Sequence, residues 1–180
     1  MGRHLRPLPA RADRVNAMST RAQIVIASAI VLLDQLVKAM VRGRLELHES
    51  ITVIPGFFDL TRVHNTGAAY GFLNSVDFPY KTALLACIAT AALVGLAMYA
   101  ASLHRDQVLT RVGLTLVIGG AAGNLIDRVT AGYVLDFVDL YWGEWHFWAF
   151  NVADAAISIG VAVMILELLG LGRIRVSRTV

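Results

Sequence analysis

The sequence predicts an all-α membrane protein with four transmembrane helices and a small extracytoplasmic β-hairpin or cradle between the first two helices. Composition is the first observation: 57% of the 180 residues are hydrophobic, 16% are charged, and the mean hydropathy is +0.62, well beyond a typical soluble domain. Length is the second, because four apolar runs have the roughly 20 residues needed to cross a bilayer. These runs are Ala22–Val41, Thr82–Leu103, Leu109–Arg128 and Asn151–Leu171.

The first run contains two opposite charges, Asp34 and Lys38, spaced i, i+4 with the acid first, which favours an ion pair on one helix face. Such a pair lowers the cost of two charges in a bilayer, and orienting a site carboxylate is the alternative role. The small residues of Ala27–Ala29 resemble a signal-peptide cleavage site, but the apolar core before them is too short. We therefore expect a retained helix.

The segment between the first two runs, about residues 43–80, is rich in β-forming residues. Its stretch SITVIPGFFDLTRVHN places two β-favouring runs around a Pro-Gly turn, which predicts a hairpin or cradle on the outer membrane surface. The second run then carries no charge. It contains the single cysteine, Cys87, which we interpret as a small helix residue, since one cysteine supports neither a disulfide framework nor a thiolate metal site.

Polar residues return at the end of the third run and at the start of the fourth. Asn124, Asp127 and Arg128 are spaced i, i+3, i+4 and share a helix face, as do Asn151 and Asp154. Asp127 and Arg128, adjacent at the end of the third run, form either an interfacial anchor pair or support for a site. The glycines of GGAAG in the same run predict close packing against another helix.

Charge distribution predicts the orientation. Arginines gather near both termini and at the short connection containing Arg105 and Arg111, whereas residues 129–150 contain no Lys or Arg. Positive connections stay cytoplasmic, so we expect both termini in the cytoplasm and the long connections outside. The predicted organisation is a basic leader at 1–21, a four-helix domain at 22–171 with an outer loop at about 129–150, and a basic tail at 172–180. Met18 is an alternative start, which would make residues 1–17 an extension. No basic patch interleaved with aromatic residues predicts nucleic-acid binding.

This topology brings the polar groups to one depth near the outer interface, including Asp136 and Asp139 from the outer loop. Asp139 is interpreted as a structural or solvated acid. Asp136 and Asp154 have no nearby cation in the sequence, which makes them candidates for a functional site. Two adjacent carboxylates share one proton, so that one can take a proton from water while the other donates to a carbonyl oxygen. That is aspartic-type amide hydrolysis.

Other chemistries find less support. No HExxH is present and the histidines lack ligand spacing, so we do not expect a metallopeptidase, and no Ser/His/Asp set is evident. The two-carboxylate chemistry requires neither a metal nor an organic cofactor. A small transporter with Asp154 in a proton relay is one alternative, and it predicts acids spread through the bilayer depth. A scaffold subunit, in which the polar cluster only anchors the helices, is another.

Five blocks carry a resemblance to a known family. DQLVK, NTGAAYGFL, GNLIDR, GYVLDFVDLYW and FNVADAAI occur in this order across residues 24–170. Together they resemble lipoprotein signal peptidase (signal peptidase II), a bacterial intramembrane aspartic peptidase of the cytoplasmic (inner) membrane. The resemblance implies removal of the signal peptide from diacylglyceryl-modified prolipoproteins, with the cut before the lipidated cysteine. The implied partners are these substrates and membrane lipids, and we expect a monomer.

The resemblance also implies residue roles. Asp136 and Asp154 match the catalytic dyad, with the active site near the outer face of the membrane. Seven further residues match substrate-binding or supporting positions: Asn65, Asn124, Asp127, Arg128, Asn151, Asp34 and Lys38.

Overall fold

The computed structural model describes residues 17–67, 73, 76 and 78–171. Most of the predicted leader at 1–21, part of the predicted cradle at 43–80 and the predicted tail at 172–180 lie outside these residues. The described elements, in chain order, are α1 (Thr20–Arg44), β1 (Ser50–Ile54), β2 (Phe58–Asn65), α2 (Lys81–Ser102), α3 (Val108–Ala131), β3 (Val134–Trp142), β4 (Trp145–His146) and α4 (Val152–Leu168).

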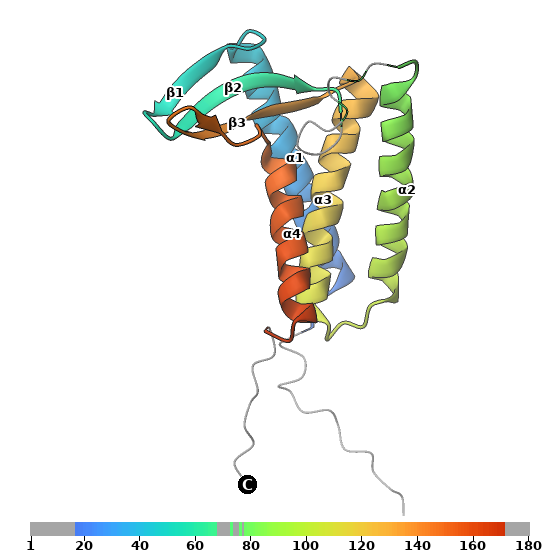
Figure 1. Ribbon diagram of the computed structural model, residues 1–180. Coiled ribbons are helices and arrows are strands. Elements are labelled where there is room, and N and C mark those ends of the chain that lie inside the picture. The colour runs from blue at the N-terminus through green and yellow to red at the C-terminus, as the bar shows by residue number, and fades with distance from the viewer. Residues whose placement is uncertain (1–16, 68–72, 74–75, 77, 172–180) are drawn as a thin grey trace, which may run out of the picture.

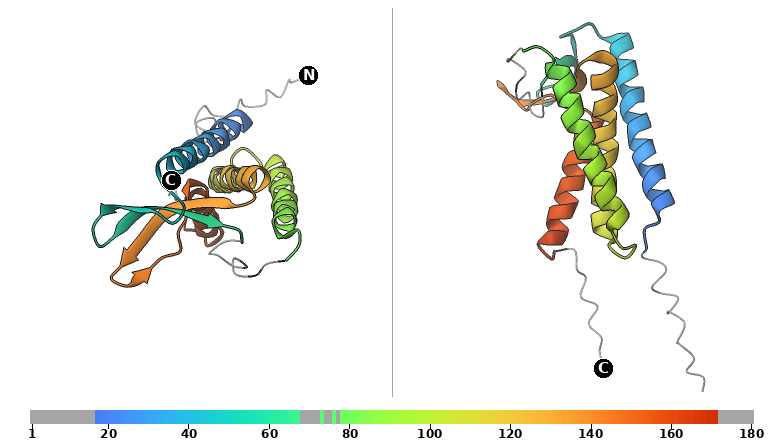
Figure 2. Two further views of the ribbon diagram at one scale, coloured as in Figure 1. Left: turned by 90° about the horizontal axis from the view of Figure 1, so that it is seen from above. Right: turned by 90° about the vertical axis from the view of Figure 1, so that its right-hand side faces the viewer.

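The helices stand side by side and the sheet lies across one end of them (Figures 1 and 2). α1 and α3 run toward the sheet, whereas α2 and α4 run away from it. α3 is central, because it packs against α1, α2 and α4, while α2 packs mainly against α3. The start of α1 and the end of α4 therefore lie together at the end opposite the sheet.

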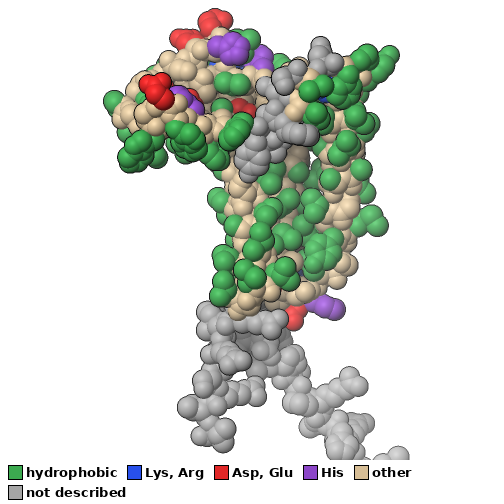
Figure 3. Space-filling model, in the orientation of Figure 1, with side chains coloured by type: hydrophobic (Ala, Val, Ile, Leu, Met, Phe, Trp, Pro, Cys, Tyr) green, Lys and Arg blue, Asp and Glu red, His purple; other side chains and the backbone are tan. Residues whose placement is uncertain are grey.

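Among the described residues, α1, α2 and α3 are long and apolar enough to cross a membrane. α4 has 17 residues and begins directly below the sheet. On α2 only Lys81 is buried, and apolar side chains cover the sides of the bundle in Figure 3. Acidic side chains and histidines gather mainly at the sheet end in that view. An apolar belt between polar ends is the surface that a bilayer requires.

Local signals explain where the helices begin and end. The side chain of Ser19 accepts a hydrogen bond from the backbone N–H of Ala22 at 3.1 Å and so caps the start of α1. α3 ends at Gly132, whose φ of 82° is the left-handed conformation that glycine adopts without a steric cost. α4 begins at Asn151 with a capping box, described below.

The sheet has the order β1-β2-β3-β4 and is antiparallel throughout. β1 and β2 follow α1, and β3 joins them from the connection between α3 and α4. The pairing places Val63 opposite Asp136 and Asn65 opposite Val134, with a bulge between Leu60 and Val63. Residues 129–150 were expected to form an outer loop without strands, and the sheet therefore extends beyond the predicted hairpin.

Two contacts fix the sheet and α4 on the bundle. Val41 and Leu45, near the end of α1, pack with Leu135 and Phe137 of β3 in a buried apolar cluster. α3 and α4 meet through glycine: a Cβ at Gly120 would lie 2.3 Å from a backbone oxygen of α4. The predicted close packing of the GGAAG segment is confirmed at this contact. Both contacts lead to the sheet end of the bundle, where the polar residues meet.

Candidate active site

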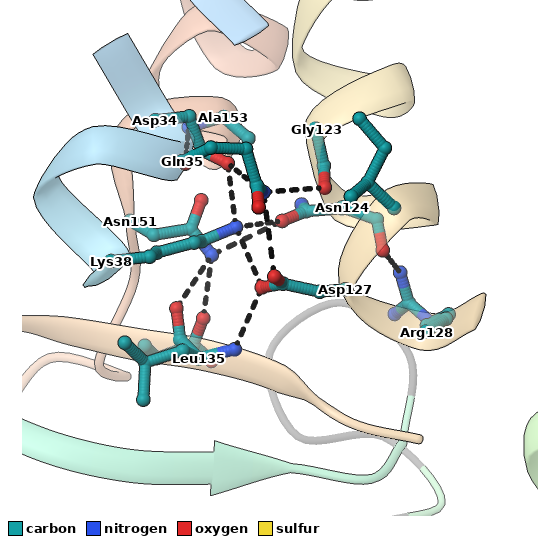
Figure 4. Close-up of polar contacts among 12 residues, drawn as sticks. Asp34, Gln35, Lys38, Gly123, Asn124, Asp127, Arg128, Leu135, Asn151 and Ala153 are labelled. Atoms are coloured by element: carbon teal, nitrogen blue, oxygen red, sulfur yellow. Dashed lines mark hydrogen bonds and ion pairs between the residues drawn. The ribbon is translucent and has the colours of Figure 1, made fainter. Parts of the chain in front are cut away.

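A buried ammonium group lies at the centre of the polar cluster, at the point where α1, α3 and α4 meet (Figure 4). Lys38 has no solvent exposure, and its Nζ contacts Asp34 Oδ2 at 2.7 Å, Asp127 Oδ2 at 3.0 Å and Asn124 Oδ1 at 3.0 Å. These three acceptors match the three donors of an ammonium group. The i, i+4 ion pair predicted within α1 is confirmed, and it extends to α3.

Asp127 connects this centre to the sheet. Its Oδ1 also pairs with Arg42 Nη2 at 2.9 Å, and its Oδ2 accepts the backbone N–H of Leu135 at 3.1 Å. The carboxylate therefore fixes the residue immediately before Asp136 in β3. Among the described residues Asp127 forms its ion pairs with Lys38 and Arg42 rather than with Arg128, so the interpretation of an anchor pair within the third helix is wrong.

Asp34 connects the same centre to α4. Its Oδ1 accepts the backbone N–H of Ala153 at 3.0 Å, one of the N–H groups in the first turn that have no acceptor within the helix. The capping box completes this helix start: Asn151 Oδ1 accepts the N–H of Asp154 at 2.9 Å, and Asp154 Oδ2 accepts the N–H of Asn151 at 3.2 Å. The carboxylate of Asp154 is therefore held by the helix that carries it.

Asparagine side chains then join the two candidate acids. Asn151 Nδ2 donates to Asp136 Oδ1 at 2.8 Å, and Asn65 Nδ2 donates to Asp136 Oδ2 at 3.1 Å. Asn124 Nδ2 donates to Asp154 Oδ1 at 2.7 Å. Asn124 Oδ1 also accepts from Asn151 Nδ2 at 3.2 Å, which links the two sides. Each carboxylate therefore has hydrogen bonds to both of its oxygens.

The environment of Asp136 favours its protonated form. Its side chain lies in the sheet, 3% exposed. Burial, and secondarily the negative charge of Asp154, raise the pKa of Asp136 from 3.8 to about 7, against the opposing effect of the two asparagine donors. Asp154 is half-buried and belongs to the first turn of a helix, where a negative charge is favourable. Two nearby acids, of which Asp136 favours its protonated form, can hold one proton between them near neutral pH.

Arg128 follows Asn124 by one turn of α3. Its Nη2 donates to the backbone oxygen of Gly67 at 3.0 Å and its Nη1 to that of Asn124 at 3.4 Å. The guanidinium also interacts electrostatically with both candidate acids. It therefore ties the segment after β2 to the helix that carries Asn124.

A cavity of about 310 Å³ opens beside the acids. Asn65, Asp136 and Asp154 line its polar end. The rest is mainly apolar: Phe147, Trp148, Ala149 and Phe150 from the segment after β4, and Ala155, Ile157, Ser158 and Ile159 from α4. An apolar cavity with a few converging polar groups is the usual form of a ligand site. Among the described residues, no three His, Cys, Asp or Glu side chains are grouped to hold a metal ion.

The structure brings all nine predicted site residues to this end of the bundle. Asp136, Asp154 and Asn65 line the cavity, and the other six hold these residues or the elements that carry them. Sequence reasoning missed Gln35 and Arg42, which also contact Asp127. Arg42 follows Lys38 by four residues, and this spacing could have revealed it. Asp139 pairs with His146 at 2.9 Å, which agrees with a structural role.

Comparisons with known proteins agree with this geometry. Residues 26–170 match the family model described as signal peptidase (SPase) II. A protein of Syntrophotalea carbinolica named lipoprotein signal peptidase is 44% identical over 146 residues, which are 81% of this chain and 89% of that protein. A Geobacter metallireducens protein of the same name is 41% identical, covering 81% of this chain and 88% of that protein.

Solved structures agree as well. A bacterial membrane enzyme determined by the in meso method at 2.3 Å resolution superimposes with a TM-score of 0.77 at 30% identity. The match covers 92% of this chain and 98% of that one. With the family model and the relatives, it shows that this chain belongs to the signal peptidase II family of aspartic peptidases and is a membrane protein.

Proposed function

We propose that this chain removes the signal peptide from diacylglyceryl-modified prolipoproteins and cuts immediately before the lipidated cysteine, with Asp136 and Asp154 as the catalytic dyad. The observation that carries the proposal is the pair of carboxylates joined by Asn151 at the polar end of an apolar cavity. The relatives that align with about four fifths of this chain are named lipoprotein signal peptidase, and this name supports the substrate class.

The two acids would divide the work by their environments. The ionised carboxylate of Asp154 takes a proton from a water molecule, whose oxygen attacks the carbonyl carbon of the scissile peptide bond. Protonated Asp136 donates to the carbonyl oxygen, which gives a tetrahedral intermediate. Collapse of this intermediate breaks the C–N bond: the leaving amine takes the proton held by Asp154, and a hydroxyl of the intermediate returns a proton to Asp136. Because the pKa of Asp136 is raised to about 7, a substantial fraction of this donor is protonated near neutral pH.

The surroundings suit a lipid-bearing peptide. An extended peptide in a bilayer needs partners for its backbone groups, and the Asn65 side chain reaches the cavity beside the acids. The aromatic segment after β4 provides apolar surface where the diacylglyceryl group would lie. We expect the lipid to bring the scissile bond to the depth of the dyad.

The same proposal includes the membrane arrangement. α4 would form a fourth span, since 17 residues extend about 25 Å at 1.5 Å per residue and the apolar core of a bilayer is about 30 Å thick. The arginines at the end opposite the sheet favour a cytoplasmic location for both termini. The site would then face the outer surface of the bacterial cytoplasmic membrane, in one four-helix domain over residues 22–171. We expect the protein to act as a monomer.

The test uses purified protein in lipid vesicles with a lipidated and a non-lipidated prolipoprotein. Asp136→Asn and Asp154→Asn are expected to abolish cleavage, whereas Asp139→Asn, the matched control on the same strand, retains it. Cleavage by either dyad variant at the wild-type rate would refute the mechanism. Equal cleavage of the non-lipidated precursor would refute the substrate assignment.

A further inference from the structure

A second polar centre lies at the end of the bundle opposite the sheet. Arg111, in the first turn of α3, is 3% exposed. Its guanidinium donates to the backbone oxygen of Leu103 at 2.8 Å and to the side-chain oxygen of Gln23. Gln23 in turn donates to Thr115 Oγ1 at 3.2 Å. Arg111 therefore joins α1, α3 and the end of α2 through acceptors that carry no charge.

Within the described residues, no carboxylate forms an ion pair with this cation. Lys38, buried at the other end, contacts two carboxylates, whereas the ion pairs among the described residues do not include Arg111. The Nε atom of Arg111 is also buried and has no hydrogen-bond partner within the described part of the chain. A buried charge without a counterion is costly, so the site favours an anion from outside the protein.

A cavity of about 420 Å³ adjoins this guanidinium, between α1, α2 and α3. Arg105, Arg111 and Thr20 supply polar groups to its lining, and Ala27, Ala97 and Ala101 are among the apolar residues. Alanine side chains are short, so they leave an apolar trough between the helices. Ala97 is exposed, which shows that the trough opens on the side of the bundle that carries the apolar belt.

We propose that this trough binds an anionic phospholipid from the adjacent leaflet, with the phosphate at Arg111 and Arg105 and an acyl chain along the alanines. A guanidinium matches phosphate in charge and in the geometry of its donors. Basic pockets between transmembrane helices are suited to anionic headgroups. The apolar trough selects a lipid over free phosphate. The site is at the far end of the bundle from the dyad and does not depend on the proposed reaction.

A purely structural role for Arg111 makes a different prediction. Hydrogen bonds to Leu103 and Gln23 require donors but no positive charge, and they leave Nε unused. A lipid site requires the charge itself. Arg111→Gln removes the charge and retains an amide donor, and Arg21→Gln is the matched control, since Arg21 is an exposed α1 residue outside the trough.

The experiment measures thermal unfolding of the delipidated full chain in a neutral detergent. Phosphatidylglycerol is expected to raise Tm by about 5 °C at roughly hundredfold excess over its Kd. Phosphatidylcholine with the same acyl chains, and inorganic phosphate, should leave Tm unchanged. Arg111→Gln should lose the response and Arg21→Gln should keep it. An equal response to both lipids, a full response in Arg111→Gln, or an equal loss in Arg21→Gln would overturn the proposal.

A second variant tests the trough without altering the arginine. Ala97→Phe fills the trough from an exposed position of α2, so the fold should tolerate it. Native mass spectrometry with phosphatidylglycerol should then show affinity at least about tenfold weaker than for the wild type. Undiminished lipid binding in Ala97→Phe would overturn the proposal. This test does not require Arg111→Gln to fold.

Discussion

Replacing Lys38 with methionine tests whether the buried ammonium holds the site together. In the wild type, the cations Lys38 and Arg42 balance the carboxylates Asp34 and Asp127. The change preserves most of the side-chain volume but leaves one carboxylate in excess, inside a cluster in which Lys38, Asp34 and Asp127 have no exposure. Removing one partner of a buried ion pair typically costs about 3–5 kcal/mol, and we expect that loss in the free energy of unfolding.

The assay is reversible unfolding in mixed detergent micelles, followed by circular dichroism, with cleavage of a lipidated prolipoprotein measured in parallel. Arg44→Met, an exposed cation on the same helix, should change stability by no more than about 0.5 kcal/mol. Adding Asp34→Asn to Lys38→Met restores neutrality and keeps an acceptor for Ala153. The double variant should therefore be more stable than the Lys38→Met protein by about 1 kcal/mol or more.

Two results would refute this reasoning. If the free energy of unfolding of Lys38→Met lies within about 1 kcal/mol of the wild-type value, the buried carboxylates do not need their cation. If the double variant is less stable than the single one, the cost does not arise from charge imbalance.

Three further predictions concern the acids and the helix contact. Because the pKa of Asp136 rises from 3.8 to about 7 on folding, the folded chain holds a proton that the unfolded chain releases, so Tm should fall between about pH 4 and pH 7. Asp136→Asn should lose much of this slope, and an unchanged slope would contradict the assignment. Gly120→Ala places a Cβ 2.3 Å from a backbone oxygen of α4 and should cost about 1–3 kcal/mol in a denaturation experiment, whereas Gly95→Ala, with nothing within 4 Å, should cost nothing measurable. Asn151→Asp keeps an acceptor for the helix cap but replaces the amide donor to Asp136 with a carboxylate. It should lower the cleavage rate at least about tenfold and also lower Tm, because the new carboxylate is fully buried beside Asp136. A rate equal to the wild type would contradict its positioning role.

The sequence predicted the chemistry-bearing residues better than the elements that carry them. Asp34, Lys38 and Asp154 were identifiable because a charge inside an apolar run is costly and requires a reason. Spacing along a helix also predicted which side chains share a face. These signals are local, and they identify residues without showing their partners in space.

The contacts between distant segments were not predictable in this way. The residues of β3 were assigned to an outer loop, and the pairing of β3 with β2 depends on long-range register that one sequence does not display. For Asp127 the sequence left open a pair with the adjacent Arg128 or support for a site. Its contacts with Lys38, Arg42 and the backbone of Leu135 agree with the second alternative. Sequence adjacency is a poor guide when a helix directs neighbouring side chains to different faces.

The glycine contact between α3 and α4 affects how strongly the geometry of the site depends on the surrounding lipid. Main-chain atoms, rather than long side chains with several rotamers, set the separation of these helices at Gly120 and Gly160. Such a contact has few alternative conformations, so the spacing between Asn124 and Asp154 should respond little to lipid fluidity or lateral pressure. Bacteria change the composition of their membranes with temperature and growth phase. The contact between Asn124 on α3 and Asp154 on α4 would keep its geometry through those changes.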